Sequence, residues 1–214
     1  MKRDTTHEFW HLTGIFTETF WKKNVVLVQA AGLCPILAAG VSLQNGVVLT
    51  VCTMLILVFC GLFMSLIGNK FAAWFRPVLY TVLATALLVG VSYVLDRYVS
   101  HELYTKLYLF IPLMAVSTLM TTRAGGFSAG NRLSASLVDA LGASLGFGLV
   151  ICLVSALREI TISNTIWGYT LPISLSMPEV SLTFAAYILL GFMAAFLQMM
   201  RSRRLRKRER GEQL

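Results

Sequence analysis

Long apolar segments separated by short polar connections run through most of the chain. Each segment is long enough to cross the hydrocarbon core of a bilayer as a helix, which takes roughly 20 apolar residues. The pattern predicts six transmembrane helices, at residues 25–41, 46–67, 74–95, 103–122, 135–157 and 180–200. Little of the chain is left between these segments, so we expect an all-α polytopic membrane protein without a soluble catalytic domain.

The composition agrees with this pattern. Of the 214 residues 57% are hydrophobic and 13% are charged, and the mean hydropathy is +0.73. Such values are typical of a polytopic membrane protein. Residues 1–24 contain charged and aromatic side chains and no small-residue cleavage site after a short apolar core, so we expect no cleavable signal peptide.

Lysines and arginines are distributed unevenly between the two sides of the six predicted spans. Fifteen of the 18 fall on the side that holds both termini. The positive-inside rule therefore predicts that both termini are cytoplasmic. Seven of these residues lie in the tail 201–214, directly after the last span. A basic run at that place indicates a topology anchor that contacts anionic lipid rather than a nucleic-acid site.

Aromatic and charged residues are interleaved before the first span, in segment 7–23. The aromatic members are Phe9, Trp10, Phe16, Phe20 and Trp21. This mixture predicts an interfacial helix, the alternative being a disordered tail with chance aromatics. The chain therefore divides into a cytoplasmic N-terminal interfacial helix (1–24), a six-helix membrane domain (25–200) and a basic cytoplasmic tail (201–214).

The first and fourth predicted spans each contain a proline. Pro35 follows Cys34, and Pro112 follows Ile111. Because proline lacks an N–H and disfavours helical backbone at the preceding residue, we expect helix 1 to break at Cys34 and helix 4 to break at Ile111. Broken helices at corresponding places in two groups of three spans predict two inverted three-helix repeats, with a site where the repeats meet near the membrane midplane.

Span five contains small and acidic residues with competing explanations. Gly142 and Gly146 form a face of small residues that favours the close approach of another helix. Asp139 is the one acidic residue within a predicted span. Intramembrane carboxylates are costly, so Asp139 is a candidate ion-path residue or the partner of Arg123 or Arg132.

Arg158 and Glu159 follow at the outer end of the same span. Adjacent residues do not face one another on a helix, so they are not expected to pair. We expect them to cap the helix and anchor it at the interface.

All four cysteines lie in apolar segments, at Cys34, Cys52, Cys60 and Cys152. Their spacing predicts neither a disulfide framework nor a self-contained metal site. Free cysteine packs as a small apolar residue, which explains the last three. Cys34 alone has an unusual backbone setting and is a candidate ligand.

Several strings of the chain match one family in the order in which that family has them. They are Trp21-Lys22-Lys23-Asn24, Gly32-Leu33-Cys34-Pro35, Phe110-Ile111-Pro112-Leu113, Arg123-Ala124, Ser136-Leu137-Val138-Asp139-Ala140-Leu141-Gly142 and Ala156-Leu157-Arg158-Glu159-Ile160. On these strings the chain resembles the Rnf–Nqr family of membrane subunits, and within it the RnfE (RsxE) and NqrD type.

The resemblance implies a non-autonomous subunit of a redox-driven, ion-translocating electron-transport complex in a bacterial inner membrane. It implies electron flow between ferredoxin or NADH and another carrier, coupled to sodium or proton movement. It also implies a homologous partner of opposite topology, of the RnfA or NqrE type, and a [2Fe–2S] cluster that binds cysteines from both subunits. Cys34 inherits one of these ligand positions.

The chain departs from the family at the second cysteine position, where Thr118 follows Ser117. A threonine hydroxyl is a hard, weakly acidic donor and does not replace a thiolate in such a cluster. Four interpretations stay open: a remodelled cluster with a substitute ligand, a register slip that lets Cys60 or Cys152 serve, an engineered removal, or a paralogue that has lost the cluster. Two other functions also stay open, an inverted-repeat permease and a cluster-less assembly subunit.

Overall fold

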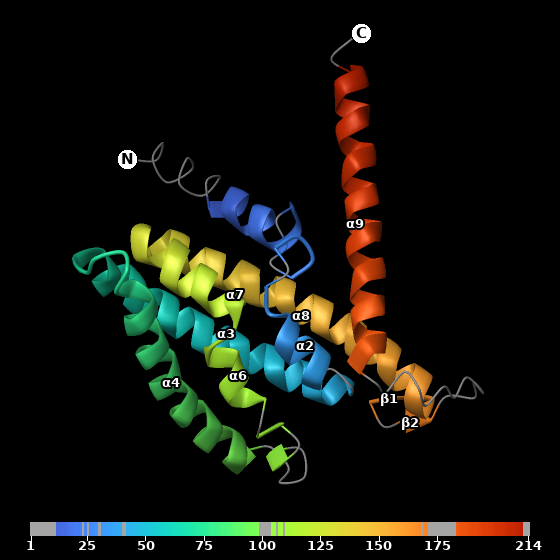
Figure 1. The fold of residues 1–214 in the computed structure, drawn as a ribbon, viewed down its shortest axis with the longest axis horizontal. Coiled ribbons are helices and arrows are strands. Elements are labelled where there is room, and N and C mark those ends of the chain that lie inside the picture. Colours follow the sequence, from blue (N-terminus) through green and yellow to red (C-terminus); the bar gives the residue numbers. More distant parts are fainter. Residues whose placement is uncertain are drawn as a thin grey trace.

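The computed structural model describes residues 12–22, 24, 26–29, 31–39, 42–98, 104–105, 107–108, 110–167, 169–170 and 183–211. These residues are almost all helical, which confirms the helical class (Figure 1). The main elements are α2 (Leu33–Ala39), α3 (Leu43–Ile67), α4 (Arg76–Tyr98), α6 (Ile111–Ala115), α7 (Thr118–Met120), α8 (Leu133–Ser163) and α9 (Thr183–Gly211). Short π- and 3-10 turns are η1 (Glu18–Lys22), η2 (Gly68–Lys70), η3 (Thr121–Phe127) and η4 (Ser128–Gly130).

Three helices are long and apolar enough to cross a membrane. They are α3, α4 up to Arg97, and α8, and they confirm the predicted spans two, three and five. Helix α8 is longer than the predicted span 135–157 at both ends. It ends at Asn164, whose left-handed backbone (φ 51°) stops the helix while its N–H donates to the Ile160 carbonyl.

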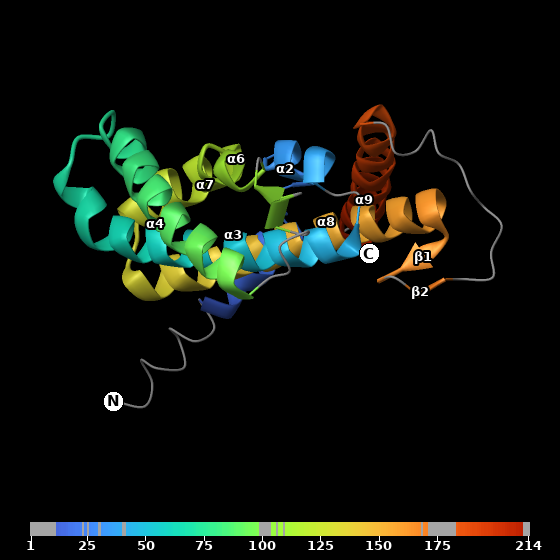
Figure 2. The same cartoon turned by 90° about the horizontal axis from the view of Figure 1, so that it is seen from below.

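Helices α3 and α8 run antiparallel and form the most extensive helix pair in the described chain (Figure 1). Small residues let their backbones approach. A methyl group on Gly148 of α8 would lie 2.3 Å from Thr50 Cγ2 of α3. Nearer the other end, Ser136 Oγ donates to the Gly61 carbonyl at 3.1 Å. This pair forms a central layer, with α2, α6 and α7 on one face and the N-terminal helix on the other (Figure 2).

The N-terminal helix, residues 12–22 of the segment predicted to be interfacial, packs against α8. A methyl group on Gly142 would contact the Phe16 carbonyl at 3.4 Å, and one on Gly146 would contact Asn24 Nδ2 at 3.1 Å. The prediction that the two glycines admit a closely packed helix is therefore confirmed. Residues 1–11 of the predicted segment lie outside the described residues.

The first predicted span is not a continuous helix. Residues 26–29, 31 and 32 form turns, and α2 begins only at Leu33. The predicted break at Cys34 is therefore wrong in position, because Cys34 and Pro35 lie in the first turn of α2. Proline is tolerated there because first-turn N–H groups have no acceptor within the helix.

The fourth predicted span follows the same rule. Helix α6 begins at Ile111 with Pro112 in its first turn. The break expected at Ile111 is confirmed, because Tyr108 and Phe110 just before the helix form turns. A second interruption follows at Val116 and Ser117, before α7 and η3 continue the chain. Both prolines thus start short helices rather than break long ones.

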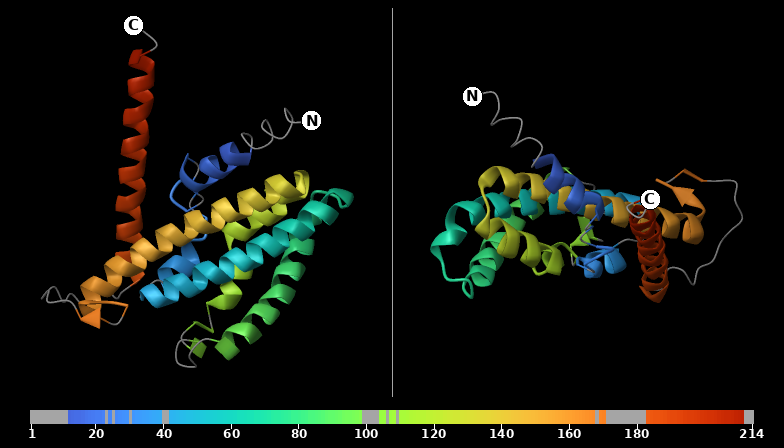
Figure 3. Two further views of the ribbon diagram at one scale, coloured as in Figure 1. Left: turned by 180° about the vertical axis from the view of Figure 1, so that it is seen from behind. Right: turned by 90° about the horizontal axis from the view of Figure 1, so that it is seen from above.

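Helix α9 projects away from the α3–α8 layer (Figure 3). Its apolar part, Phe184–Met200, is shorter than the three long spans. The helix continues without interruption into the basic segment, as far as Gly211. Between α8 and α9, the strands β1 (Thr165–Ile166) and β2 (Tyr169–Thr170) form a small antiparallel hairpin, which the all-α prediction did not include.

Candidate functional site

The first and fourth predicted spans, which we call the interrupted segments, contact each other directly. The Gly32 N–H donates to Thr118 Oγ1 at 3.1 Å, although 86 residues separate them. Gly32 has a positive φ of 75°, a conformation that favours glycine. A methyl group there would also lie 3.3 Å from Phe147 Cε2 of α8. Glycine at this position therefore gives both the turn into α2 and the close approach to the second segment.

This contact brings together the two positions that the family motif marks. Cys34 is two residues after Gly32, in the first turn of α2, and its side chain is exposed on the chain. Thr118 is the first residue of α7 and is also exposed. We call the surface formed by the exposed residues Cys34 and Thr118 the motif surface.

Asn24 organises the chain just before the first interrupted segment. Its side-chain oxygen accepts the N–H groups of Val26 at 3.0 Å and Leu27 at 3.2 Å. Its amide donates to the carbonyls of Phe20 at 3.2 Å and Gly146 at 3.3 Å. One buried side chain thus ends the N-terminal helix, starts the following turn and ties both to α8.

Arg158 and Glu159 are buried at the far end of α8, with 1% and 8% of their surfaces exposed. Arg158 Nη1 donates to the Leu37 carbonyl in the last turn of α2 at 3.2 Å. Glu159 Oε2 accepts the N–H of Leu43, the first residue of α3, at 2.7 Å. The prediction that they cap their own helix is wrong, because both side chains bind the backbone of the neighbouring helices α2 and α3. Exposure at an interface is also wrong for these buried residues.

Tyr80 of α4 holds the other interrupted segment. Its buried hydroxyl donates to the carbonyl of Ala115, the last residue of α6. Next to it, Ser117 Oγ donates to the Met114 carbonyl at 2.8 Å. The Tyr80 hydroxyl thus supplies a donor to the last carbonyl of α6, while the Met114 carbonyl also accepts the Ser117 N–H at 3.2 Å.

Asp139 lies in a buried charge pair. Its Oδ1 accepts Arg123 Nη1 at 2.9 Å and Thr19 Oγ1 at 2.7 Å, and only 1% of the residue is exposed. Arg123 was one of the two predicted partners, so that alternative is confirmed. Both donors lie on π-helical turns, Thr19 on η1 and Arg123 on η3. Among the described residues Asp139 Oδ2 has no hydrogen-bond partner, which keeps Asp139 a candidate polar or ion-path residue.

The remaining cysteines do not join Cys34. Cys52 and Cys60 are buried within α3, and Cys152 is half-buried on α8. In the described part of the chain no three His, Cys, Asp or Glu side chains gather as a metal site would require. Thr118 contributes a hard hydroxyl oxygen that accepts a backbone N–H. This donor set does not fit a [2Fe–2S] cluster held by two thiolates of this chain.

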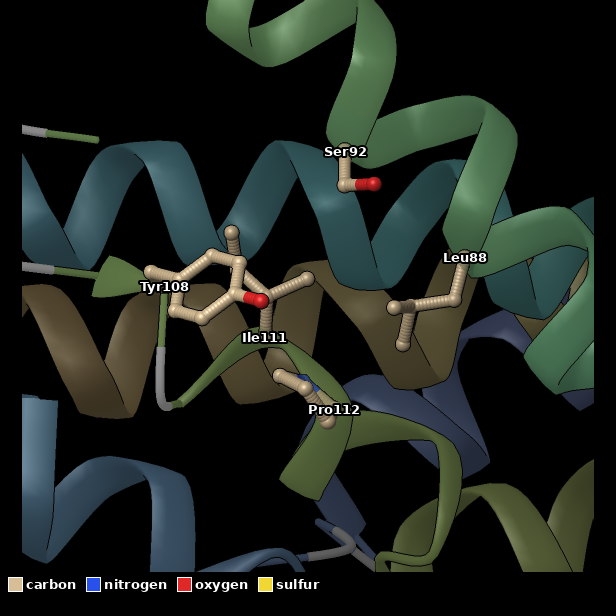
Figure 4. Close-up of a pocket in the computed structure, with 5 residues that line it drawn as sticks. All are labelled: Leu88, Ser92, Tyr108, Ile111 and Pro112. Atoms are coloured by element: carbon tan, nitrogen blue, oxygen red, sulfur yellow. The ribbon is translucent and has the colours of Figure 1, made fainter. Parts of the chain in front are cut away.

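A cavity of about 240 Å³ lies between α4 and the start of α6 (Figure 4). Leu88 and Ser92 of α4 line it together with Tyr108, Ile111 and Pro112. The Ser92 hydroxyl already donates to the Val89 carbonyl at 2.9 Å. The cavity therefore offers apolar volume beside the second interrupted segment but no group that suggests chemistry.

Three long apolar helices, two interrupted segments that meet, and a charge pair buried between helical segments define a polytopic helical membrane protein. Residues 12–200 match the family described as "Rnf-Nqr subunit, membrane protein". The chain belongs to this family, as its motifs predicted.

Similar curated proteins share one description, the E-type subunit of an ion-translocating oxidoreductase complex. The chain is 33% identical over 153 residues to that of Buchnera aphidicola, 30% identical over 204 residues to that of Shewanella oneidensis and 36% identical over 155 residues to that of Cellvibrio japonicus. These matches cover 72%, 88% and 72% of this chain, and 63%, 87% and 64% of the three relatives. With Buchnera and with Shewanella piezotolerans, the match thus spans just under two thirds of the relative's length.

Sequence reasoning missed three of the residues that shape the site. Asn24 gave a sequence signal, because it ends a family string and is a polar residue between two lysines and an apolar run. Tyr80 gave no signal, since tyrosine is ordinary within a membrane span. Gly32 was part of a recognised motif, but its contact with Thr118 joins segments too far apart in sequence for periodicity to reveal.

Proposed function

We propose that this chain is the E-type subunit of an Rnf ion-translocating oxidoreductase complex in a bacterial inner membrane. Both termini are cytoplasmic, and a homologous RnfA- or NqrE-like subunit of opposite topology is its direct partner, beside other subunits of the complex. The chain has no redox turnover alone; it contributes to an intramembrane electron-transfer site shared with that partner.

One observation carries this proposal above the others. The two motifs that mark the site in the family are far apart in sequence, and the Gly32 N–H and Thr118 Oγ1 bring them within 3.1 Å. Cys34 and Thr118 are both exposed there. A site completed by a second subunit requires such an open surface, whereas a site complete in one chain would be enclosed.

The order of elements supports six crossings in two inverted repeats. In the first half a short helix, α2, precedes α3 and α4; in the second half the short helices α6 and α7 precede α8 and α9. The central members α3 and α8 are antiparallel, and α4 and α9 diverge from them at opposite ends (Figure 1). An antiparallel relation is what an odd number of crossings in each repeat demands.

The donor chemistry supports an altered or absent cluster. Cys34 is the one candidate thiolate ligand on the motif surface, and the Thr118 hydroxyl serves the backbone of Gly32. We therefore assign Cys34 as the only candidate [2Fe–2S] ligand of this chain and give Thr118 a structural role.

The function is tested by purification of the affinity-tagged chain from native membranes, followed by identification of co-purifying proteins and measurement of redox-driven ion transport. A homologous six-span partner and loss of complex activity on deletion of the gene are expected. Solute uptake by the isolated chain in liposomes would instead support the permease. A complex that assembles and works without this chain would overturn the proposal.

A further inference from the structure

Each interrupted segment leaves backbone carbonyls inside the membrane domain, where water cannot satisfy them. Backbone of this kind persists only where other parts of the protein supply donors. Two buried side chains do so here, Arg158 for α2 and Tyr80 for α6. Both have only 1% of their surface exposed, so each is held by packing as well.

Each donor binds a carbonyl three residues along the chain from a motif position. Arg158 binds the carbonyl of Leu37, three residues after Cys34. Tyr80 binds the carbonyl of Ala115, three residues before Thr118. A shift at the Leu37 carbonyl therefore moves Cys34 on the same helix, and a shift at the Ala115 carbonyl moves Thr118 through the two residues that join α6 to α7.

The donors are also exchanged between the halves of the chain. Arg158 belongs to α8 in the second half and holds α2 of the first, while Tyr80 belongs to α4 in the first half and holds α6 of the second. Short helices of seven and five residues have little stability of their own. The positions of α2 and α6 relative to one another therefore depend on their contacts with the longer helices.

We infer that Arg158 and Tyr80 are positioning residues for the motif surface: each fixes one interrupted helix from the opposite half, and together they set the distance between Cys34 and Thr118. A buried guanidinium is expensive inside a membrane protein. The inference rests on the proposed function only in taking the motif surface to be an electron-transfer site. The positions of Cys34 and Thr118 follow from the contacts of Arg158 and Tyr80 whatever the surface does.

The test measures this distance within the assembled complex. All variants carry Thr118→Cys, and native membranes are first treated with an iron chelator so that both thiols are free. A short bifunctional thiol reagent then joins that position to Cys34, and the linked peptides are quantified by mass spectrometry. Tyr80→Phe and Arg158→Met remove the two donors. The matched controls are Tyr93→Phe and Arg97→Met, because Tyr93 and Arg97 are exposed on α4.

We expect each donor variant to lower the initial cross-linking rate about five- to thirtyfold. Loss of the hydrogen bond destabilises the native position of the short helix, relative to displaced positions, by about one or two kcal/mol, which corresponds to that factor. The controls are expected to leave the rate unchanged. Arg158→Lys, which keeps a cationic donor, should restore most of it. Since Tyr80→Phe and Arg158→Lys are conservative, they remain informative if Arg158→Met fails to accumulate.

Unchanged cross-linking in Tyr80→Phe, or equal loss in Arg158→Lys and Arg158→Met, would overturn the inference. So would a loss of the same size in the controls. Partner co-purification is recorded for every sample, so a failed complex, which counts against the proposed function, is distinguishable from an intact complex with a displaced motif surface.

Discussion

The contact between Gly148 and Thr50 makes a testable statement about how closely α3 and α8 pack. In Gly148→Ala the new methyl group would lie 2.3 Å from Thr50 Cγ2 and 3.1 Å from its Oγ1. Thr50 has little freedom to move, because it is β-branched and its hydroxyl donates to the Gly46 carbonyl at 2.7 Å. Overpacking of this kind costs about 1–3 kcal/mol.

Alanine also has a higher helix propensity than glycine, by about 1 kcal/mol, which offsets part of that cost. Gly90 of α4 provides the control, since nothing lies within 4 Å of a methyl group there. Gly90→Ala should show the propensity gain alone, so the difference between the two variants, about 1–3 kcal/mol, isolates the contact. The free energy of unfolding is measured by titration of the purified chain from mild detergent into SDS, followed by tryptophan fluorescence.

Thr50→Ser removes the offending methyl group and keeps the hydroxyl. In the double variant with Gly148→Ala it should recover a substantial part of the loss, with a coupling energy of about 0.5–3 kcal/mol. The close packing of α3 on α8 would be refuted if Gly148→Ala were as stable as Gly90→Ala, or if Thr50→Ser gave no recovery.

Further variants test the charge pair, the motif surface and the topology. Asp139→Asn leaves the Arg123 guanidinium unpaired and should lower stability by about 3–5 kcal/mol in the same titration; adding Arg123→Met should recover part of this, and no recovery would contradict a direct pair. Thr118→Cys adds a second thiol to the motif surface and should raise the iron and acid-labile sulfide of the anaerobically purified complex, whereas an unchanged content would argue against a cluster site at this surface. An alkaline phosphatase fusion at Leu214 should be inactive, since 15 of 18 basic residues favour a cytoplasmic tail; an active fusion would reverse the topology.

The long helices could be predicted because continuous apolar stretches determine them. Spans two, three and five appear within a few residues of their expected positions, and the glycine face of span five admits a closely packed helix as expected. The ends were harder to predict. Helix α8 continues to Ser163, and Arg158 and Glu159 did not mark its boundary because both are buried and bind the backbone of α2 and α3.

The backbone conformation of the interrupted segments could not be predicted from local sequence alone. Pro35 and Pro112 correctly marked irregular backbone, but a proline can begin a helix as well as break one, and only tertiary contacts decide which. Gly32 turns with a positive φ because Phe147 and Thr118 confine it. Such a constraint comes from residues distant in sequence, so pattern and propensity do not contain it.

The π-helical turns limit how the length of this chain can vary. A π turn accommodates one more residue than an α turn, because its hydrogen bonds join residues five apart. Deletion of one residue from η3 ahead of Arg123 would restore ordinary winding and rotate that side chain by about 100°, away from Asp139. Segment 118–127 is therefore expected to resist insertion and deletion among homologues even where its side chains change, and a length change there would mark members that pair this buried charge differently.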